Sequence, residues 1–460
     1  MLMEDIVYLG ILLLSTWFGQ YYRKIKDPFT KQWASTLYGL LVVTTVSGSH
    51  VVHPIICTLV NAIIVTQLSW KICHIVSIFF TFFYLLVIVR LCHLFGFEPV
   101  SGHTSLIMMM MTLRHSGVAF EINSAATAPE DDAQGLKSEA LKRVTFLDIF
   151  HYGFSYMGVL TGPHYRYRTY WDSLHRPTSE YADHWGITLY KLKQVAVFAL
   201  IFLVTSNAFP AKYALMEEFN SRNFLYRFCY IYPTFVTFRM RMFIGMILSE
   251  CVCQMAGLGC YPTKSETVSG LGPRNYKLIE TLSSDLEQLK KEDIDFETVH
   301  NMNVEKVETC NTVRTAMKVW NTTVQYWMAN CVYKPFPFKG LRTPAVFLIS
   351  SVWHGYAPGY FLCISQITFF LPMEDIYVKI YKQCADNSSA KMFLGALLWF
   401  LKMSCMAYLG LSFQLLQFDE TMTYYKSVYF AGHVLVAILY VTGRIIAPKI
   451  LVKDEKKKGL

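Results

Sequence analysis

Long apolar runs without Asp, Glu, Lys or Arg recur along the chain. They cover residues 6–20, 51–70, 72–89, 195–210, 343–373 and 427–443. A helix needs about 20 apolar residues to cross a bilayer, and a backbone in lipid must satisfy its own hydrogen bonds. The runs are also too long and too uniformly apolar for barrel strands. The pattern therefore predicts an all-α, polytopic integral-membrane helical bundle with about nine to eleven transmembrane helices.

Two polar stretches interrupt the apolar pattern, at residues 121–145 and 262–312. We expect both to be loops, the second with a short amphipathic helix around Asp285–Glu292. We predict that residues 1–448 form one membrane domain that includes these loops, and that residues 449–460 form a basic tail. No internal repeat is evident, so a transporter built from repeats has weak support.

The composition agrees with a membrane protein and argues against a nucleic-acid-binding one. Hydrophobic residues make up 53% of the chain and charged residues 16%, where a soluble domain carries about 25% charge. The net charge is +9, but the basic residues flank apolar runs and form no stripe on a soluble domain. Twelve cysteines are scattered without a C-x-x-C pair. We therefore predict no metal site and no disulfide framework.

Basic residues also predict the topology. The connection at residues 23–31 is basic, which favours a cytosolic loop there and a lumenal N-terminus. Lys457 and Lys458 near the C-terminus resemble a dilysine retrieval signal, which predicts residence in the endoplasmic reticulum. The alternative is a generic basic anchor for the last helix; both interpretations place the tail in the cytosol. Asn387-Ser388-Ser389 is a glycosylation sequon that could be used only in a lumenal loop.

His354 is the most informative polar residue inside an apolar run. It stands in Trp353-His354-Gly355, followed by Pro358-Gly359-Tyr360. A histidine can accept a proton near neutral pH, which suits a general base. Gly355 and Gly359 permit close backbone approach, and Pro358 predicts a break or kink. The alternative is a histidine that hydrogen-bonds between helices for packing.

Asn321 is a second polar residue in an apolar, aromatic segment. If the segment is one continuous helix, Asn321 shares a face with Val324 and Gln325, while Trp320 and Trp327 form another stripe. An asparagine amide can orient a histidine or donate to an oxyanion. The alternative is an amide that serves helix packing. Glu250, also inside an apolar block, is either a paired charge or a site residue.

Two pairs of arginines adjoin apolar runs: Arg166 with Arg168, and Arg239 with Arg241. Guanidinium groups at a membrane boundary could hold the phosphates of a nucleotide-bearing or lipid substrate. The alternative is that these side chains snorkel to the interface beside tyrosine belts.

These residues together resemble the membrane-bound O-acyltransferase family. The resemblance rests on Trp353-His354-Gly355 with Gly359-Tyr360, on Trp320-Asn321 upstream, and on two downstream patterns. These are Tyr408 with Phe413, and Tyr425, Tyr429, Phe430 and His433. Each pattern alone is weak evidence for the family, but all four in this order within a polytopic chain are strong evidence. The similarity runs nearly end to end and is strongest to the lysophosphatidylinositol acyltransferase branch.

The resemblance implies a helical bundle around a catalytic tunnel. It implies His354 as the base, Asn321 as its catalytic partner, and substrate contacts from Trp320, Trp353, Tyr360 and the four arginines. Acyl-CoA and a lysophospholipid would be the substrates, with no metal or other cofactor and no nucleic-acid partner. The expected reaction transfers a polyunsaturated, arachidonoyl-type chain to the sn-2 hydroxyl of lysophosphatidylinositol in phospholipid remodelling. The alternatives are a choline, ethanolamine or serine lysolipid, another acceptor in the family, or a membrane transporter. No oligomeric state is predicted.

Overall fold

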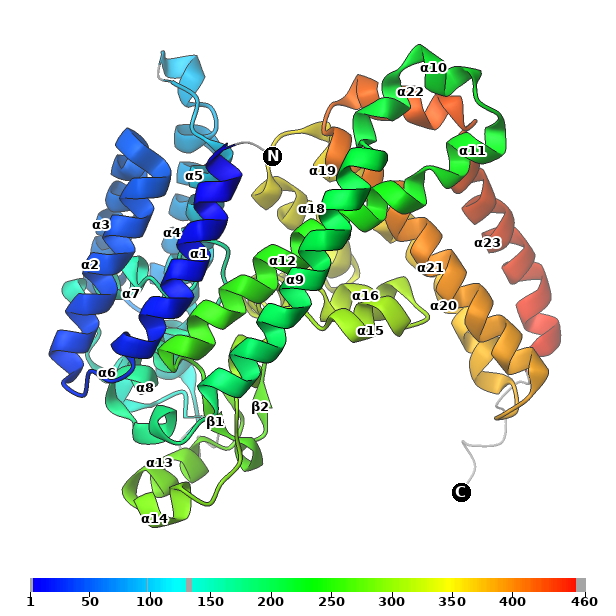
Figure 1. The fold of residues 1–460 in the computed structure, drawn as a ribbon. Coiled ribbons are helices and arrows are strands. Elements are labelled where there is room, and N and C mark those ends of the chain that lie inside the picture. The colour runs from blue at the N-terminus through cyan, green and yellow to red at the C-terminus, as the bar shows by residue number, and fades with distance from the viewer. Residues whose placement is uncertain (1–2, 97, 130–134, 452–460) are drawn as a thin grey trace. The chain divides into compact units, whose positions relative to one another are not determined.

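The computed structural model describes residues 3–96, 98–129 and 135–451, and helices dominate this part of the chain (Figure 1). The described residues form two compact units. The first contains residues 1–197, 243–302 and 321–337, and the second contains residues 198–242, 303–320 and 338–460. Two long helices, α9 (His184–Ala208) and α12 (Ile231–Ala256), contribute residues to both units.

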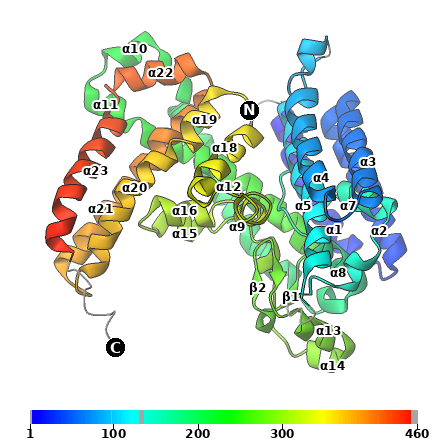
Figure 2. The ribbon, with the colours of Figure 1, turned by 180° about the vertical axis from the view of Figure 1, so that it is seen from behind.

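The first unit is built around helices near the N-terminus, which lie side by side in both views (Figures 1 and 2). The helices that belong wholly to this unit are α1 (Met3–Tyr22), α2 (Pro28–Ser47), α3 (Val52–Gln67), α4 (Cys73–Phe83), α5 (Gly102–Thr127), α6 (Glu139–Lys142), α7 (Phe146–Phe154), α8 (Tyr167–His175), α13 (Tyr276–Ser284), α14 (Leu286–Leu289) and α17 (Thr322–Trp327). Local sequence explains where they begin. For example, α2 starts after Asp27, whose carboxylate accepts the Thr30 N–H at 2.8 Å, with Pro28 as the first helical residue.

Short strands occur in the polar stretch predicted as a loop. β1 (Tyr261–Pro262) pairs antiparallel with β4 (Ile294–Asp295), and β2 (Thr267–Val268) pairs with β3 (Gly272–Pro273). The predicted amphipathic helix is present, but most of it lies earlier, in α13, and only α14 falls within Asp285–Glu292. Residues 261–302 of the first unit are therefore ordered, and the buried Tyr261 and Tyr276 both donate to the Asp172 carboxylate on α8.

The second unit holds the C-terminal helices. Its complete helices are α10 (Glu217–Ser221), α11 (Phe224–Cys229), α15 (Val304–Thr309), α16 (Val313–Val319), α18 (Arg342–His354), α19 (Pro358–Ile364), α20 (Ile367–Gln383), α21 (Ser389–Leu415), α22 (Phe418–Ser427) and α23 (Ala431–Ile450).

Helices α20, α21 and α23 lie side by side in both views (Figures 1 and 2). His433 near the start of α23 contacts Gln366 before α20, with 3.0 Å between Nε2 and Oε1. Farther along, the Tyr377 hydroxyl donates to the Leu439 carbonyl at 3.0 Å. These contacts show that α20 and α23 run parallel. The loop after α20, which contains Asn387, therefore lies at the same end of this unit as the end of α23.

The predicted all-helical membrane class is confirmed, with a lower count of long spans. By length and composition, five helical stretches of the described chain could cross a membrane: Pro28–Gln67, His184–Leu215, Pro358–Gln383, Ser389–Leu415 and Ala431–Ile450. This is fewer than nine to eleven, partly because apolar runs break into shorter helices. The run at 72–89, for example, forms α4 followed by a π-helical turn over Tyr84–Val89.

Two predicted boundaries are wrong. Helix α5 continues through Thr127, so the stretch at 121–145 does not begin as a loop. Its Glu121 is buried and accepts the Tyr167 backbone N–H at 2.7 Å. Helix α12 also runs without a break through Arg239 and Arg241, which were expected to adjoin an apolar run and instead lie within one helix. Residues 452–460, with Lys457 and Lys458, lie outside the described residues.

Candidate active site

His354 is the last residue of α18. The chain leaves the helix at Gly355, with φ 149° and ψ −171°, and α19 starts again at Pro358. A residue with a Cβ rarely adopts this φ, so Gly355 permits the sharp exit. The break predicted from Pro358 is confirmed. The imidazole thus stands at a helix C-terminus, where the carbonyl dipoles favour a cation.

Gly359 is required by close packing within the same unit. Its N–H donates to the Leu416 carbonyl at 2.7 Å, and a Cβ at this position would lie 2.1 Å from the Ser412 carbonyl oxygen. The start of α19 is therefore in direct backbone contact with the end of α21. The predicted role of Gly359 in close approach is confirmed for a neighbouring helix.

His354 stands at one end of a series of packed rings, which we name the aromatic row: Trp320, Phe238, Phe413, Tyr360 and His354. Phe413 packs against both His354 and Tyr360, with ring centroids 5.2 and 4.8 Å apart. Phe238 continues the row to Phe413 at 5.4 Å, and Trp320 lies parallel to Phe238 at 6.5 Å. These separations are within the range of aromatic pairs. The row connects the tryptophan of the Trp-Asn pair to the histidine within the second unit.

Trp353 also packs against His354. It is buried, and its ring centroid lies 4.9 Å from that of His354. The imidazole is therefore surrounded largely by aromatic groups and is partly accessible. Such surroundings exclude much of the water around a proton-accepting group.

Residues from the two downstream aromatic patterns form a second cluster, which contains Tyr408, Tyr425 and His433. The Tyr408 hydroxyl and His433 Nδ1 are 3.0 Å apart, and Tyr425 stacks on Tyr408 with centroids 4.7 Å apart. Gly432 lies so close that a Cβ would be 2.7 Å from the Tyr408 ring. His433 therefore has structural partners on both ring nitrogens and serves the packing of α20, α21 and α23.

Asn321 does not lie inside a helix as the spacing argument assumed. Helix α16 ends at Val319, α17 begins at Thr322, and Asn321 between them has φ 50° and ψ 54°. Asparagine tolerates this left-handed conformation better than most residues. The shared face predicted with Val324 and Gln325 is wrong, because the left-handed backbone of Asn321 interrupts the helix and Asn321 lies outside both α16 and α17. The Asn321 Oδ1 is buried and has no hydrogen-bond partner within the described protein.

Arg166 and Arg168 are both buried in the first unit. The Arg166 Nε lies 3.3 Å from a Glu121 carboxylate oxygen, in an ion pair whose two side chains are almost fully buried. Arg168 donates to the Gly135 carbonyl at 2.9 Å and covers the Tyr276 ring. Each guanidinium thus has a protein partner in this structure, and phosphate contact by these residues stays a prediction.

Arg239 and Arg241 differ although they are two residues apart on α12. Arg239 is buried and donates to both oxygens of Glu308, at 2.6 Å for Oε1, whereas Arg241 is exposed. A substrate phosphate at Arg239 would have to compete with Glu308. Arg241 is the more accessible of the pair to an anion.

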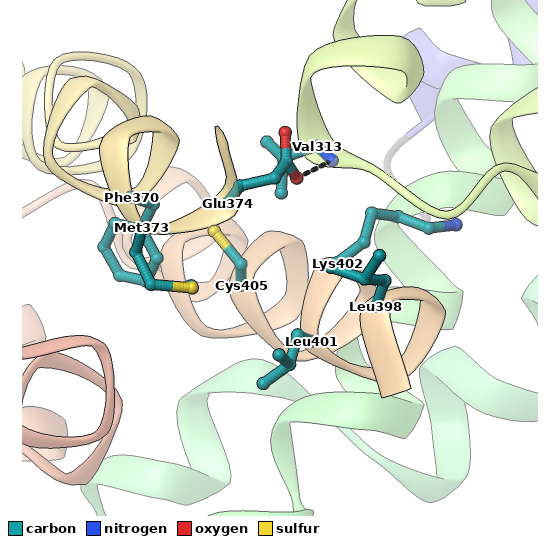
Figure 3. Close-up of a pocket in the computed structure, with 8 residues that line it drawn as sticks. All are labelled: Val313, Phe370, Met373, Glu374, Leu398, Leu401, Lys402 and Cys405. Carbon is teal, nitrogen blue, oxygen red and sulfur yellow. Dashed lines mark hydrogen bonds between the residues drawn. The ribbon is translucent and has the colours of Figure 1, made fainter. Parts of the chain in front are cut away.

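The hairpin of α15 and α16, which ends in Trp320, is anchored by two buried charged groups (Figure 3). Glu374 on α20 accepts the backbone N–H groups of Val313 and Arg314, at 3.1 Å for Arg314, at the start of α16. Lys402 on α21 donates to the Val307 carbonyl at the end of α15, at 2.8 Å. A small, partly open pocket lies between these anchors and is otherwise lined by apolar side chains and Cys405.

Comparison with known proteins decides the family. The profile of the membrane-bound O-acyltransferase family matches residues 103–418, which include the whole aromatic row and Asn321. The chain belongs to the membrane-bound O-acyltransferase family. The resemblance drawn from the motifs is confirmed, and this family member is a multi-pass integral membrane acyltransferase. The transporter alternative is set aside.

Relatives match over nearly the full length. The membrane-bound acylglycerophosphatidylinositol O-acyltransferase of Drosophila melanogaster is 37% identical over 96% of this chain and 92% of its own length. The proteins of the same name from Xenopus laevis and Homo sapiens are 32% and 30% identical, over 97% and 94% of this chain and 94% and 92% of their own lengths.

Sequence reasoning missed some residues of this family member's site. Phe238 and Gln366 were not predicted, although Phe238 belongs to the aromatic row and Gln366 contacts His433. Phe413 was found only through the family pattern. An apolar ring in an apolar run carries no local signal of its partner, so only the tertiary contacts could identify Phe238.

Proposed function

We propose that this protein transfers a fatty acyl chain from acyl-CoA to the sn-2 hydroxyl of lysophosphatidylinositol. The observation that carries the proposal is the position of His354, which ends helix α18 and packs against the aromatic rings of Trp353 and Phe413. The chain also belongs to a family of O-acyltransferases. The acceptor is supported by the relatives named as acylglycerophosphatidylinositol O-acyltransferases, which match over more than nine-tenths of this chain. We further propose a polyunsaturated donor chain, a catalytic tunnel, and action in the endoplasmic reticulum with a cytosolic tail.

His354 acts as the general base in this scheme. It takes the proton of the glycerol hydroxyl, and the hydroxyl oxygen attacks the thioester carbonyl carbon. The new C–O bond forms, the C–S bond breaks, and the proton passes to the departing CoA thiolate. The C-terminal dipole of α18 stabilises the imidazolium that exists between these steps. Asn321 orients the reacting groups or donates its amide N–H to the oxyanion, and Trp320, Trp353 and Tyr360 border the acyl groups.

Substitution of His354 tests the catalytic assignment. General-base catalysis typically contributes about 10²–10⁴-fold, so His354→Ala should lower kcat by at least about 100-fold. The exposed His175→Ala in the first unit is the control and should keep the wild-type rate. A folded His354→Ala protein with normal acyl transfer would exclude His354 as the base.

A substrate panel tests the acceptor and the donor. Purified protein is given lysolipids with inositol, choline, ethanolamine and serine headgroups, each with a saturated and an arachidonoyl-type acyl-CoA, and the products are detected by mass. We expect the phosphatidylinositol product to dominate, with the unsaturated donor preferred. Faster turnover of another headgroup would replace the proposed acceptor.

The arginine proposal is tested by apparent affinities. Arg241→Ala should raise the KM for acyl-CoA or lysolipid, because its accessible guanidinium can contact a phosphate. For Arg166, Arg168 and Arg239, a raised KM in folded alanine variants would support phosphate contact. An effect on stability alone would assign them to packing.

A further inference from the structure

Glu250 on α12 is a fully buried carboxylate with several donors around it. It forms an ion pair with Lys191 on α9, and His300 Nδ1 lies 3.5 Å from the same carboxylate. Its Oε1 also accepts the backbone N–H groups of Asn301 and Met302, at 2.6 and 2.9 Å. A buried charge with this many partners holds the backbone at residues 300–302 in one place.

That backbone in turn holds the residues directly after Asn321. The Thr322 N–H donates to the Asn301 carbonyl at 2.8 Å, and the Thr322 hydroxyl donates to the His300 carbonyl at 2.6 Å. The Thr323 hydroxyl donates to Asn301 Oδ1 at 2.7 Å. The contacts from Glu250 to Thr323 all lie within the first unit, which also contains Asn321.

Asn321 needs such support. Its left-handed backbone, with φ 50° and ψ 54°, is less favourable than a helical or extended one for a residue with a Cβ. Its carbonyl accepts the Gln325 N–H at 3.0 Å as the first bond of α17. If residues 322–323 moved, the backbone at Asn321 would relax and the side-chain amide would change direction. Its buried Oδ1 has no hydrogen-bond partner within the described protein that would hold the amide in place.

We propose that Glu250 is a positioning residue for Asn321, acting through Asn301 and the two threonines. The proposal rests on the proposed function, in which the Asn321 amide takes part in acyl transfer. Glu250 itself touches no substrate. Its carboxylate fixes the backbone that sets the direction of the amide, so that its loss should slow chemistry and leave substrate binding unchanged.

The test compares three changes in purified full-length protein, assayed on whichever lysolipid the wild type acylates. Glu250→Gln removes the charge. Thr323→Val removes one hydroxyl at nearly constant shape, and Thr323→Ser keeps that hydroxyl. Asp172→Asn is the matched control, because Asp172 is also a buried carboxylate of the first unit, and the partners described for it are Tyr261, Tyr276 and Arg176.

We expect Glu250→Gln to lower kcat by about 10–100-fold with the KM for acyl-CoA within about twofold of wild type, as a misplaced catalytic group does. Thr323→Val should lower kcat and Thr323→Ser should restore it. In an Asn321→Ala background, Glu250→Gln should cause no further loss, because the group that it positions is already gone. Asp172→Asn should reduce stability and keep the kcat of the folded protein.

Several results would overturn the inference. They are a raised KM with unchanged kcat in Glu250→Gln, losses that multiply in the double variant, or equal rates for Thr323→Val and Thr323→Ser. If Glu250→Gln does not fold, the threonine pair decides. A wild type that acylates a different headgroup refutes the proposed acceptor and leaves this comparison intact, so the two failures are distinguishable.

Discussion

Gly359→Ala should move α19 away from α21 and disturb the wall of the site. The added Cβ would lie 2.1 Å from the Ser412 carbonyl oxygen and 2.7 Å from the Leu416 Cα. Both are backbone atoms, so no side chain can turn aside. Ordinary contact begins near 3.4 Å, and the two segments must therefore separate by about 1.3 Å.

This separation has a cost in stability and a cost in rate. Overpacking costs roughly 1–3 kcal/mol, and weakening the hydrogen bond from the Gly359 N–H to the Leu416 carbonyl adds about 1 kcal/mol. We therefore expect a loss of about 2–4 kcal/mol in the free energy of unfolding. Because Tyr360 moves with α19 while Phe413 belongs to α21, the rings around His354 separate, and a shift of about 1 Å can lower the rate by about 100-fold.

The assay measures thermal unfolding in detergent and the rate of acyl transfer by the folded fraction. Gly340→Ala is the control, because a Cβ there has nothing within 4 Å. It should change neither quantity. Wild-type stability and rate in Gly359→Ala would refute the reasoning, since they would mean that α19 and α21 do not touch at Gly359.

Three further predictions follow from contacts within single units. Burial lowers the pKa of His300, but the hydrogen bond and charge of Glu250 outweigh it and raise that pKa above its usual value near 6.5. The stabilisation that protonated His300 gains from Glu250 is complete below pH 6.5 and is lost as the pH rises through the raised pKa of His300. Thermal stability should therefore fall over that pH window in wild type and not in His300→Gln. Glu374→Leu leaves the buried Val313 N–H and the partly buried Arg314 N–H of α16 without their acceptor, and should lower stability by about 1–3 kcal/mol in a thermal unfolding assay. Since α20 and α23 run parallel, epitopes after Asn387 and at the C-terminus should be accessible from the same side of the membrane. With a cytosolic tail Asn387 should carry no glycan, and epitopes on opposite sides would contradict the parallel packing.

The membrane class and the main motif were predictable because their signals are local. Apolar runs long enough to span a bilayer predict helices without knowledge of their neighbours. Pro358 cannot continue a helix, so the break after His354 followed from its position in the chain. His354 is also conspicuous by itself, as an ionisable group within an apolar run.

Other predictions failed where a distant partner overrides the local pattern. Helix α12 passes through Arg239 because Glu308, far along the chain, neutralises that charge. Glu121 extends helix α5 because it accepts N–H groups at the start of α8. The helical periodicity drawn through Asn321 was wrong because Thr322 and Thr323 bond to residues 300–301, and a new helix starts at Thr322 after the left-handed Asn321.

The sequence by itself thus determined a helical membrane protein with a histidine in a family-specific motif, since hydrophobicity, helix breaking and motif spacing are properties of neighbouring residues. Only the tertiary structure decided which rings surround His354, which carboxylates hold the arginines, and how Glu250 connects to the residues that support Asn321. Most of those contacts join residues that lie tens of positions or more apart. Their energies depend on which groups share a buried space after folding, and no local pattern records that.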